Sequence, residues 1–162
     1  MEAENHECVS VLFAGIAGFN TWSQGLPAHK VMMLLNEFYS HVDDILIQEM
    51  PLLYKVDMLG DTYMVAGNLV GTDMRHAASM VKFALRMQEE ASHVLRPDLD
   101  DGSTTLQLRI GIHCGPAVSG IVGKVRRRFT VLGDTVNLAS RCETSAPSGC
   151  LQVTEQVSRL FK

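Results

Sequence analysis

The sequence feature that most constrains the fold is a long amphipathic stretch that runs from residue 27 to residue 48. Its apolar residues recur at spacings of three and four, the period of one face of an α-helix, and they are Val31, Leu34, Leu35, Phe38, Val42, Ile45 and Leu46. Pro27 suits the first turn of such a helix, because the N–H that proline lacks would have no helical partner there. We therefore predict a helix over residues 27–48 whose apolar face is buried against another layer of structure.

Short apolar segments on both sides of this helix predict the strands of that second layer. Residues 9–14 form an apolar run that ends at Gly15. Residues 52–56 and 63–66 flank residues 58–61, where Gly60 favours a tight turn between two strands. A strand, a helix and a β-hairpin therefore follow one another along the first half of the chain.

The second half of the chain begins with another amphipathic pattern, which covers residues 74–92. After a polar loop at 97–104, apolar alternation resumes at residues 106–112 and predicts a further strand. The order strand, helix, strand, strand, helix, strand predicts an α+β fold, a ferredoxin-like βαββαβ sandwich in which helices cover one face of a mainly antiparallel sheet.

The C-terminal part of the sequence predicts a hairpin and two short helices. We place the hairpin turn at Gly115 and Pro116, with a returning strand that carries Val118, Ile121 and Val122. Asp134 is the predicted N-cap of a helix over residues 135–143. A last helix is indicated by Val157, Leu160 and Phe161.

Composition bounds the class of protein. With 162 residues and 46% apolar residues, the chain predicts a single domain with a buried core. The formal charge of −4 argues against a nucleic-acid binder, and the aromatic platform of an RNA-recognition domain is absent. The four cysteines form no C-x-x-C pair, which favours free thiols. Neither a run of about 20 apolar residues nor a secretion signal is present, so we expect a cytoplasmic domain without membrane insertion.

Function has to come from local motifs, because many unrelated proteins share this plan. Four segments, residues 12–19, 54–64, 108–115 and 132–141, together resemble the class III nucleotidyl cyclase catalytic domain. The resemblance extends from residue 8 to about residue 161 and is greatest to guanylyl cyclases, especially the beta subunit of soluble guanylyl cyclase. It implies conversion of a nucleoside triphosphate into a 3′,5′-cyclic monophosphate and pyrophosphate, in a site shared between two wrapped domains.

The same resemblance implies a cofactor of two divalent ions, Mg²⁺ or Mn²⁺, which prefer carboxylate oxygens. The family holds these ions with one aspartate after the first strand and another in the turn of the following hairpin. Asp61 matches the second aspartate, whereas Gly15 replaces the first. We therefore expect Asp61 to be a partial or vestigial ligand and a partner subunit to hold most of the metal. By itself, Asp61 is more typical of a turn-forming aspartate.

The opposite half of the family's site is better preserved. Asn137 and Arg141 match the asparagine that orients the ribose and the arginine that stabilises charge on the phosphate. They lie four residues apart, on one face of the predicted helix, although a solvated pair has the same spacing. Arg109 matches a position that contacts the triphosphate in some members, and it is also compatible with a side chain that points to solvent.

Base recognition in the family depends on two positions, which correspond here to Asp57 and to Thr130 with its neighbour Val131. A carboxylate accepts hydrogen bonds from guanine N1–H and the exocyclic amine, so Asp57 favours GTP. Thr130 can donate or accept and is compatible with ATP. The basic cluster of Lys124 and residues 126–128 fits a solvated hairpin tip or a dimer contact, and alternatively attracts triphosphate.

Two hypotheses for function follow. The first is a guanylyl cyclase half-site that works in a heterodimer and is weak as a homodimer, because Gly15 removes a carboxylate while Asn137 and Arg141 remain. The second is an inactive pseudo-cyclase that serves as a dimerisation or regulatory module; an adenylyl cyclase is a further alternative. The family usually continues past Phe161 with a hairpin that carries a phosphate-binding lysine. We predict one cyclase domain over residues 1–162 without that hairpin.

Overall fold

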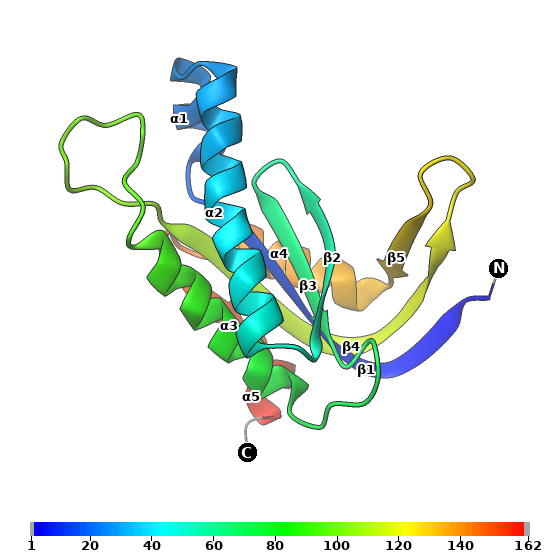
Figure 1. Cartoon of the computed structure of the whole chain (residues 1–162). Helices are drawn as coiled ribbons and strands as arrows, with labels where there is room; N and C mark the ends of the chain where they lie inside the picture. Colours follow the sequence, from blue (N-terminus) through cyan, green and yellow to red (C-terminus); the bar gives the residue numbers. More distant parts are fainter. Residues whose placement is uncertain (1, 161–162) are drawn as a thin grey trace.

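A computed structural model describes residues 2–160 and contains one curved sheet with helices on both faces (Figure 1). The strands are β1 (Glu4–Ile16), β2 (Leu53–Leu59), β3 (Thr62–Gly67), β4 (Leu108–Val122), β5 (Arg128–Leu132) and β6 (Leu151–Val153). The helices are α1 (Phe19–Trp22), α2 (Ala28–Glu49), α3 (His76–Ala91), α4 (Asp134–Ser145) and α5 (Glu155–Arg159), and a 3₁₀ turn covers Ser23–Gly25.

The sheet confirms the predicted α+β class. Its strand order is β2-β3-β1-β4-β5, with antiparallel pairing along this path, and β6 runs parallel to β4. The first six predicted elements all form, and α2 and α3 begin and end within two residues of their predicted limits. Short α1, β5 and β6 were not predicted, because none of them is long enough to carry a recognisable periodicity.

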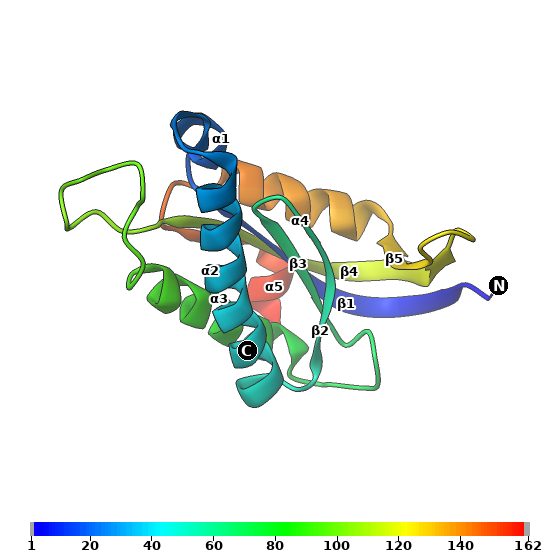
Figure 2. The same ribbon diagram turned by 45° about the horizontal axis from the view of Figure 1, so that its top comes forward.

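Alternation along β1 divides the core into two clusters. Leu12, Ala14 and Ile16 pack with α2 and α3. Val9 and Val11 point to the other face and pack with Ala139 of α4. The prediction that helices cover one face is therefore wrong for α4, which lies across β1 and β4 from α3 (Figure 2).

The predicted hairpin at Gly115 and Pro116 is also wrong, because β4 continues through both residues and carries Val118, Ile121 and Val122. The pairing of β1 with β4 shifts register between His6 and Val9, which face Ala117 and Gly115. Pro116 therefore lies opposite a β-bulge, where the ladder does not need the N–H that proline lacks. The chain turns between β4 and β5 instead, with positive φ angles of 99° at Gly123 and 52° at Arg126.

The start of α4 differs from its prediction as well. Gly133, with a φ angle of 136°, is the N-cap residue, and Asp134 is the first residue of the helix without a side-chain capping bond. The hydroxyl of Thr135 donates to the carbonyl of Pro116 over 2.7 Å, which fixes this end of the helix to β4. At the other end of the chain, α5 buries Val157, whereas Phe161 lies outside the described residues.

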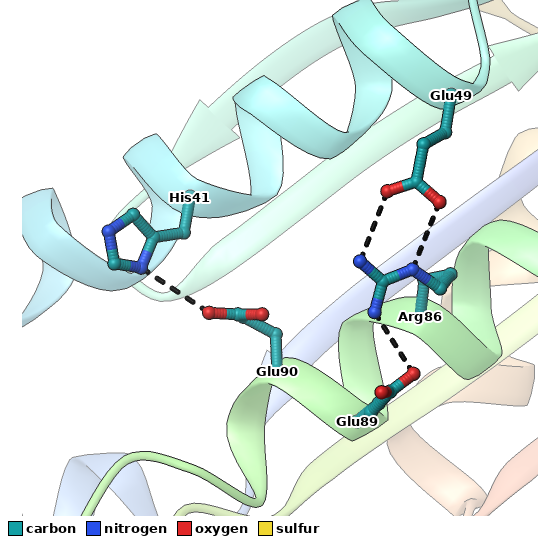
Figure 3. A network of polar contacts seen from close by, with 5 residues as sticks. All are labelled: His41, Glu49, Arg86, Glu89 and Glu90. Atoms are coloured by element: carbon teal, nitrogen blue, oxygen red, sulfur yellow. Dashed lines mark hydrogen bonds and ion pairs between the residues drawn. The ribbon is translucent and has the colours of Figure 1, made fainter.

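Ion pairs link α2 to α3 on their solvent side (Figure 3). Arg86 donates through Nε and Nη2 to the two carboxylate oxygens of Glu49, over 3.1 and 3.0 Å, and through Nη1 to Glu89 over 3.0 Å. His41 lies 3.4 Å from Glu90 in the same network. The hydrogen bonds from Arg86 lower the pKa of Glu49.

Two further sequence expectations concern the cysteines and the membrane. All four cysteines are free thiols, as predicted, and only Cys150 is exposed. Between residues 2 and 160, the structure contains no helix with the length and apolar character needed to cross a bilayer.

Candidate active site

The first group of site residues lies where β1 ends beside the β2–β3 turn. Gly60 adopts a φ of 60° in this turn, which turns the chain so that Asp61 meets β1. The Oδ2 atom of Asp61 accepts a 2.9 Å hydrogen bond from the backbone N–H of Ile16, and its carbonyl accepts one from the Tyr39 hydroxyl. Asp61 is therefore held beside Gly15.

A second carboxylate, which sequence reasoning missed, occupies the same place. A Cβ atom built on Gly15 would lie 2.5 Å from Oε1 of Glu143 and 3.4 Å from Oδ2 of Asp61. Glu143 is four residues after Ala139, whose side chain is fully buried, so the two share the inner face of α4. The four-residue spacing from Ala139 is the sequence signal that could have predicted that Glu143 points toward the sheet rather than into solvent.

A close approach between helix and strand brings Glu143 to this position. A Cβ atom at Gly111 would lie 2.1 Å from the backbone nitrogen of Glu143 and 2.5 Å from the carbonyl carbon of Cys142. Only glycine fits there, because the α4 backbone rests directly on β4. Gly111 is two residues along β4 from Arg109, which pairs with Gly15 across the ladder. The end of α4 is therefore placed over the end of β1.

The electrostatics of this corner depend on Glu143, Asp61 and Arg109. Burial raises the pKa of Glu143, the nearby charge of Arg109 lowers it, and the negative charge of Asp61 raises it. The net shift is upward, because the carboxylate is half-buried beside a second carboxylate. Arg109 is itself half-buried, and its charge acts on Glu143.

Asn137 and Arg141 lie on the outer face of α4 and are both exposed. Cys142 and Ala139, which are buried, fix the opposite face of the helix against the sheet. The sulfur of Cys142 lies 3.2 Å from the carbonyl of Gln152 in β6. Helix α4 is therefore held against the sheet. It presents the amide of Asn137 and the guanidinium of Arg141 one helical turn apart, where a ligand can reach both.

The candidate base-recognition residues are connected through an arginine that sequence reasoning treated only as part of a basic cluster. The Nη2 atom of Arg128 donates to Oδ2 of Asp57, and Oδ1 of Asp57 accepts a 2.8 Å bond from the N–H of Met58. Thr130 is half-buried, and its hydroxyl donates to the carbonyl of Arg128 over 3.3 Å. Val131 has 4% of its surface exposed, so its side chain belongs to the core.

Curvature of the sheet makes this connection possible. Strands β2 and β5 are the two ends of the strand order, yet Asp57 of β2 meets Arg128 of β5. The rings of Tyr54 and Phe129 pack edge to face beside them, with centroids 5.4 Å apart. Arg128 thus contacts both Asp57, through its side chain, and Thr130, through its carbonyl.

The site residues therefore fall into three groups. The first contains Asp61, Glu143 and Arg109 around Gly15, the second contains the Asp57–Arg128 pair with Thr130, and the third contains Asn137 and Arg141 on α4. Among residues 2–160, no hydrogen bond or ion pair joins side chains of different groups. Nor do residues 2–160 contain a cluster of three or more histidine, cysteine or acidic residues able to hold a metal.

This fold is that of nucleotidyl cyclase catalytic domains. The chain belongs to the family described as Adenylate and Guanylate cyclase catalytic domain, whose sequence model matches residues 1–162. The membership inferred from the four sequence segments is thereby confirmed.

Individual relatives agree with this assignment. Guanylate cyclase 32E of Drosophila melanogaster is 34% identical over 166 residues, covering 100% of this chain and 14% of that protein. Guanylate cyclase soluble subunit beta-2 of Rattus norvegicus is 31% identical over 160 residues, covering 99% of this chain and 23% of that protein. The catalytic core of a rhodopsin-guanylyl cyclase with converted specificity, solved with ATPαS, has a TM-score of 0.90 and 28% identity, covering 100% of this chain and 85% of that one. The chain spans less than a quarter of both curated relatives.

Proposed function

We propose that this domain is the base-binding and Asn–Arg half of a heterodimeric guanylyl cyclase site. The observation that carries the proposal is the asymmetry between the Asn–Arg pair on α4 and the corner around Gly15. Asn137 and Arg141 are exposed and rigidly supported on α4, whereas the family's first metal aspartate is absent at Gly15. A domain with this asymmetry is complete on one side of a shared site and altered on the other.

The proposed reaction is an intramolecular phosphoryl transfer on GTP. The ribose 3′-oxygen attacks the α-phosphorus and forms the new O–P bond, while the bond from that phosphorus to the bridging oxygen breaks and pyrophosphate leaves with its electron pair. The proton of the 3′-hydroxyl passes to solvent. Asn137 orients the ribose, and Arg141 donates hydrogen bonds to the phosphate oxygens, where negative charge develops.

The proposed base pocket is formed by Asp57, Arg128 and Thr130. The carboxylate of Asp57 can accept from guanine N1–H and from the exocyclic amine, while Arg128, its ion-pair partner, can donate to guanine O6. Adenine offers an acceptor at N1, which the ionised Asp57 cannot satisfy. This complementarity favours GTP. ATP remains the second candidate, because the similar rhodopsin-guanylyl cyclase core with converted specificity was solved with ATPαS.

The proposed partner is a second cyclase domain that carries both metal aspartates. Divalent cations bound there would neutralise phosphate charge and activate the 3′-oxygen. In this arrangement Asp57, Asn137 and Arg141 of this chain hold the base, the ribose and the α-phosphate against the partner's half. A homodimer is the alternative assembly, and its expected activity is low because each copy lacks a carboxylate at Gly15.

The test is to mix this domain with an alpha-type cyclase domain in the presence of Mn²⁺ and GTP and to measure cyclic GMP. We expect product from the mixture and little from the domain alone. An Arg141→Ala variant of this chain should lower the yield of product by about 10²-fold or more, whereas the corresponding change in the partner should not. Strong activity of the isolated domain would contradict the heterodimeric assignment.

The loss of the carboxylate at Gly15 also favours a second candidate function, that of an inactive dimerisation or regulatory module. Nucleotide titration separates the two candidates. A cyclase half-site binds GTP saturably when the partner is present, and Asn137→Ala weakens that binding. A purely structural module binds the partner but shows no saturable binding of GTP or ATP.

A further inference from the structure

We propose that Cys8 and Cys114 form a redox pair, in which a peroxide oxidises Cys8 and Cys114 then closes a disulfide between β1 and β4. The proposal is independent of the cyclase assignment, because neither cysteine belongs to the three groups of site residues. It identifies a covalent modification site in the N-terminal half of β1, whereas Gly15 lies at the other end of that strand.

The two thiols lie close together on the same side of the sheet. In the β1–β4 ladder Ser10 pairs with Cys114, and Cys8 is two residues before Ser10. Both cysteines belong to the apolar cluster that packs against α2 and α3, Cys114 as a buried member and Cys8 at its margin. Burial, the charge of Cys8 and a hydrogen bond with Cys8 together raise the pKa of Cys114 to about 11. A hydrogen bond acts only at short range, so the two sulfurs are neighbours.

A histidine of α3 is placed to take the proton of Cys8. Nε2 of His76 lies 4.0 Å from Sγ of Cys8, and Nδ1 lies 3.0 Å from Oγ of Ser10, a fully buried residue. When Nδ1–H donates to the Ser10 hydroxyl, Nε2 carries the free lone pair and faces the thiol. Burial lowers the pKa of His76, so its imidazole is neutral at pH 7 and can accept a proton. The thiol thus has a base within reach, and the base has a residue that orients it.

A surface cavity gives a small oxidant access to Cys8. The cavity has a volume of about 620 Å³, and Cys8, His76 and Asp73 are among the residues that line it. Cys8 is half-buried, whereas Cys114 is only 4% exposed, so the oxidant reaches Cys8 first. Oδ2 of Asp73 is buried and has no hydrogen-bond partner within residues 2–160. Its negative charge favours protonated His76 and therefore stabilises the imidazolium that forms when Cys8 loses its proton.

A β-bulge allows β1 to adjust at Cys8. The register of β1 against β4 shifts between His6 and Val9, and within the described pairing of these strands Cys8 has no ladder partner. The carbonyl of Cys8 instead accepts a 2.8 Å hydrogen bond from Nδ2 of Asn68. A disulfide needs a narrow range of Cα and Cβ separations. The bulge is the part of β1 that can shift to meet this requirement while the regular ladder beyond it stays intact.

One molecule of hydrogen peroxide is consumed for each disulfide. His76 takes the proton of Cys8, the Cys8 sulfur attacks one peroxide oxygen, and the O–O bond breaks. The products are the sulfenic acid of Cys8 and a hydroxide, which takes the proton from His76 to become water.

The second step closes the disulfide. The Cys114 sulfur attacks the Cys8 sulfur, the S–O bond breaks, and the departing hydroxide combines with the Cys114 proton as a second water. Together the two thiols lose the two electrons that the peroxide gains. Oxidation of Cys8 also removes the thiolate charge that raises the pKa of Cys114, so Cys114 loses its proton more readily at this step.

The test treats the reduced domain with hydrogen peroxide under native conditions, alkylates the remaining thiols after unfolding and identifies the peptides by mass spectrometry. We expect a peptide in which Cys8 is cross-linked to Cys114 and the loss of two thiols per chain, both reversed by dithiothreitol. Cys114→Ser should stop the reaction at the sulfenic acid of Cys8, which dimedone traps. Cys150→Ser is the matched control, because it removes the exposed thiol and should leave the cross-link unchanged.

Substitution of His76 tests whether the thiol has a base. His76→Gln should slow cross-linking about tenfold, because an unassisted thiol is only a few per cent thiolate at neutral pH. His29→Gln changes an exposed histidine and should leave the rate unchanged. Thermal unfolding of the reduced variants confirms that they fold. The proposal is overturned if Cys114 can still be alkylated after Cys8 has been oxidised, if Cys8 pairs with another cysteine, or if His76→Gln forms the cross-link at the wild-type rate.

Discussion

Arg128 holds the carboxylate of Asp57 in an ion pair that spans the two ends of the sheet. The second oxygen of Asp57 accepts from the N–H of Met58, so both oxygens of this carboxylate are oriented by the protein before any ligand binds. The carbonyl of Arg128 also accepts the hydrogen bond from the Thr130 hydroxyl, so one residue connects both candidate base-recognition positions. Under the proposed function, selection of the base therefore depends on the β4–β5 hairpin as well as on β2.

Replacement of Arg128 by glutamine should affect nucleotide use more than stability. The pair is exposed, and exposed ion pairs contribute about 1 kcal/mol or less to the free energy of unfolding. Without its partner, Asp57 loses a fixed orientation, so the KM for GTP in the heterodimer should rise. Arg127→Gln, a change of the neighbouring exposed arginine, is the control and should leave KM unchanged. Equal effects of both variants on KM would contradict the prediction, because Arg128 would then act only through its positive charge, as its neighbour does.

Arg141→Ala should lower the turnover of the heterodimer by about 10²-fold or more, the scale associated with loss of one donor to a charged transition state. The midpoint of thermal unfolding should not change, because the Arg141 side chain is exposed on α4. Arg159→Ala, which removes an exposed arginine from α5, serves as the control. A normal rate of cyclic GMP formation by Arg141→Ala would exclude the proposed role.

Gly111→Ala should destabilise the domain by about 3 kcal/mol, because the added methyl group would overlap the backbone of α4 at Glu143. Unfolding in urea measures the change in free energy. Gly25→Ala is the matched control, since a Cβ at Gly25 meets no atom within 4 Å. If both variants unfold at the same urea concentration, α4 does not rest on β4 as closely as described.

Stability should fall as the pH is lowered from neutral to about 5, in part because of His76. Burial lowers the pKa of His76, against an opposing effect of Asp73. His76 therefore binds a proton more readily in the unfolded chain than in the folded domain. For this reason the free energy of unfolding increases as the pH rises. The loss of stability from His76 is absent above its pKa in the unfolded chain and complete below its pKa in the folded domain.

Urea unfolding at several pH values measures this dependence. His76→Gln should reduce the slope of stability against pH without removing it, because burial also lowers the pKa of His113. His29→Gln changes an exposed histidine and should leave the slope unchanged. A steeper slope in His76→Gln would reverse the expected sign.

Thiol labelling should discriminate among the four cysteines. Cys150 is exposed and should react first with iodoacetamide. Burial raises the pKa of Cys114 to about 11, and Cys142 is also buried, so both should react only after unfolding. Peptide mass spectrometry over time measures the order. Early labelling of Cys114 would indicate that β4 opens more readily than the pairing with β1 suggests.

Local features of the chain were predictable from sequence. The α2 helix follows from the spacing of its apolar residues, and the position of Asp61 follows from Gly60 in a two-strand turn, since both depend on neighbours along the chain. The continuity of β4 through Pro116 was not predictable, because it depends on a bulge in a different strand.

The contacts between site residues that are far apart in the sequence were not predictable either. Asp57 and Arg128 are 71 residues apart in sequence, and nothing local indicates that the ends of the sheet approach each other. Glu143 reaches Gly15 only because Gly111 lets α4 lie against β4. Such contacts are set by packing between elements, so residue type and spacing along one element do not specify them.

Helix α4 has a consequence for communication between sites. It carries Arg141 on its outer face and Glu143, two residues later, on its inner face over Gly15. Both residues belong to the one continuous helix, which rests on β4 at Gly111, so a displacement of α4 along β4 would move Arg141 and Glu143 together.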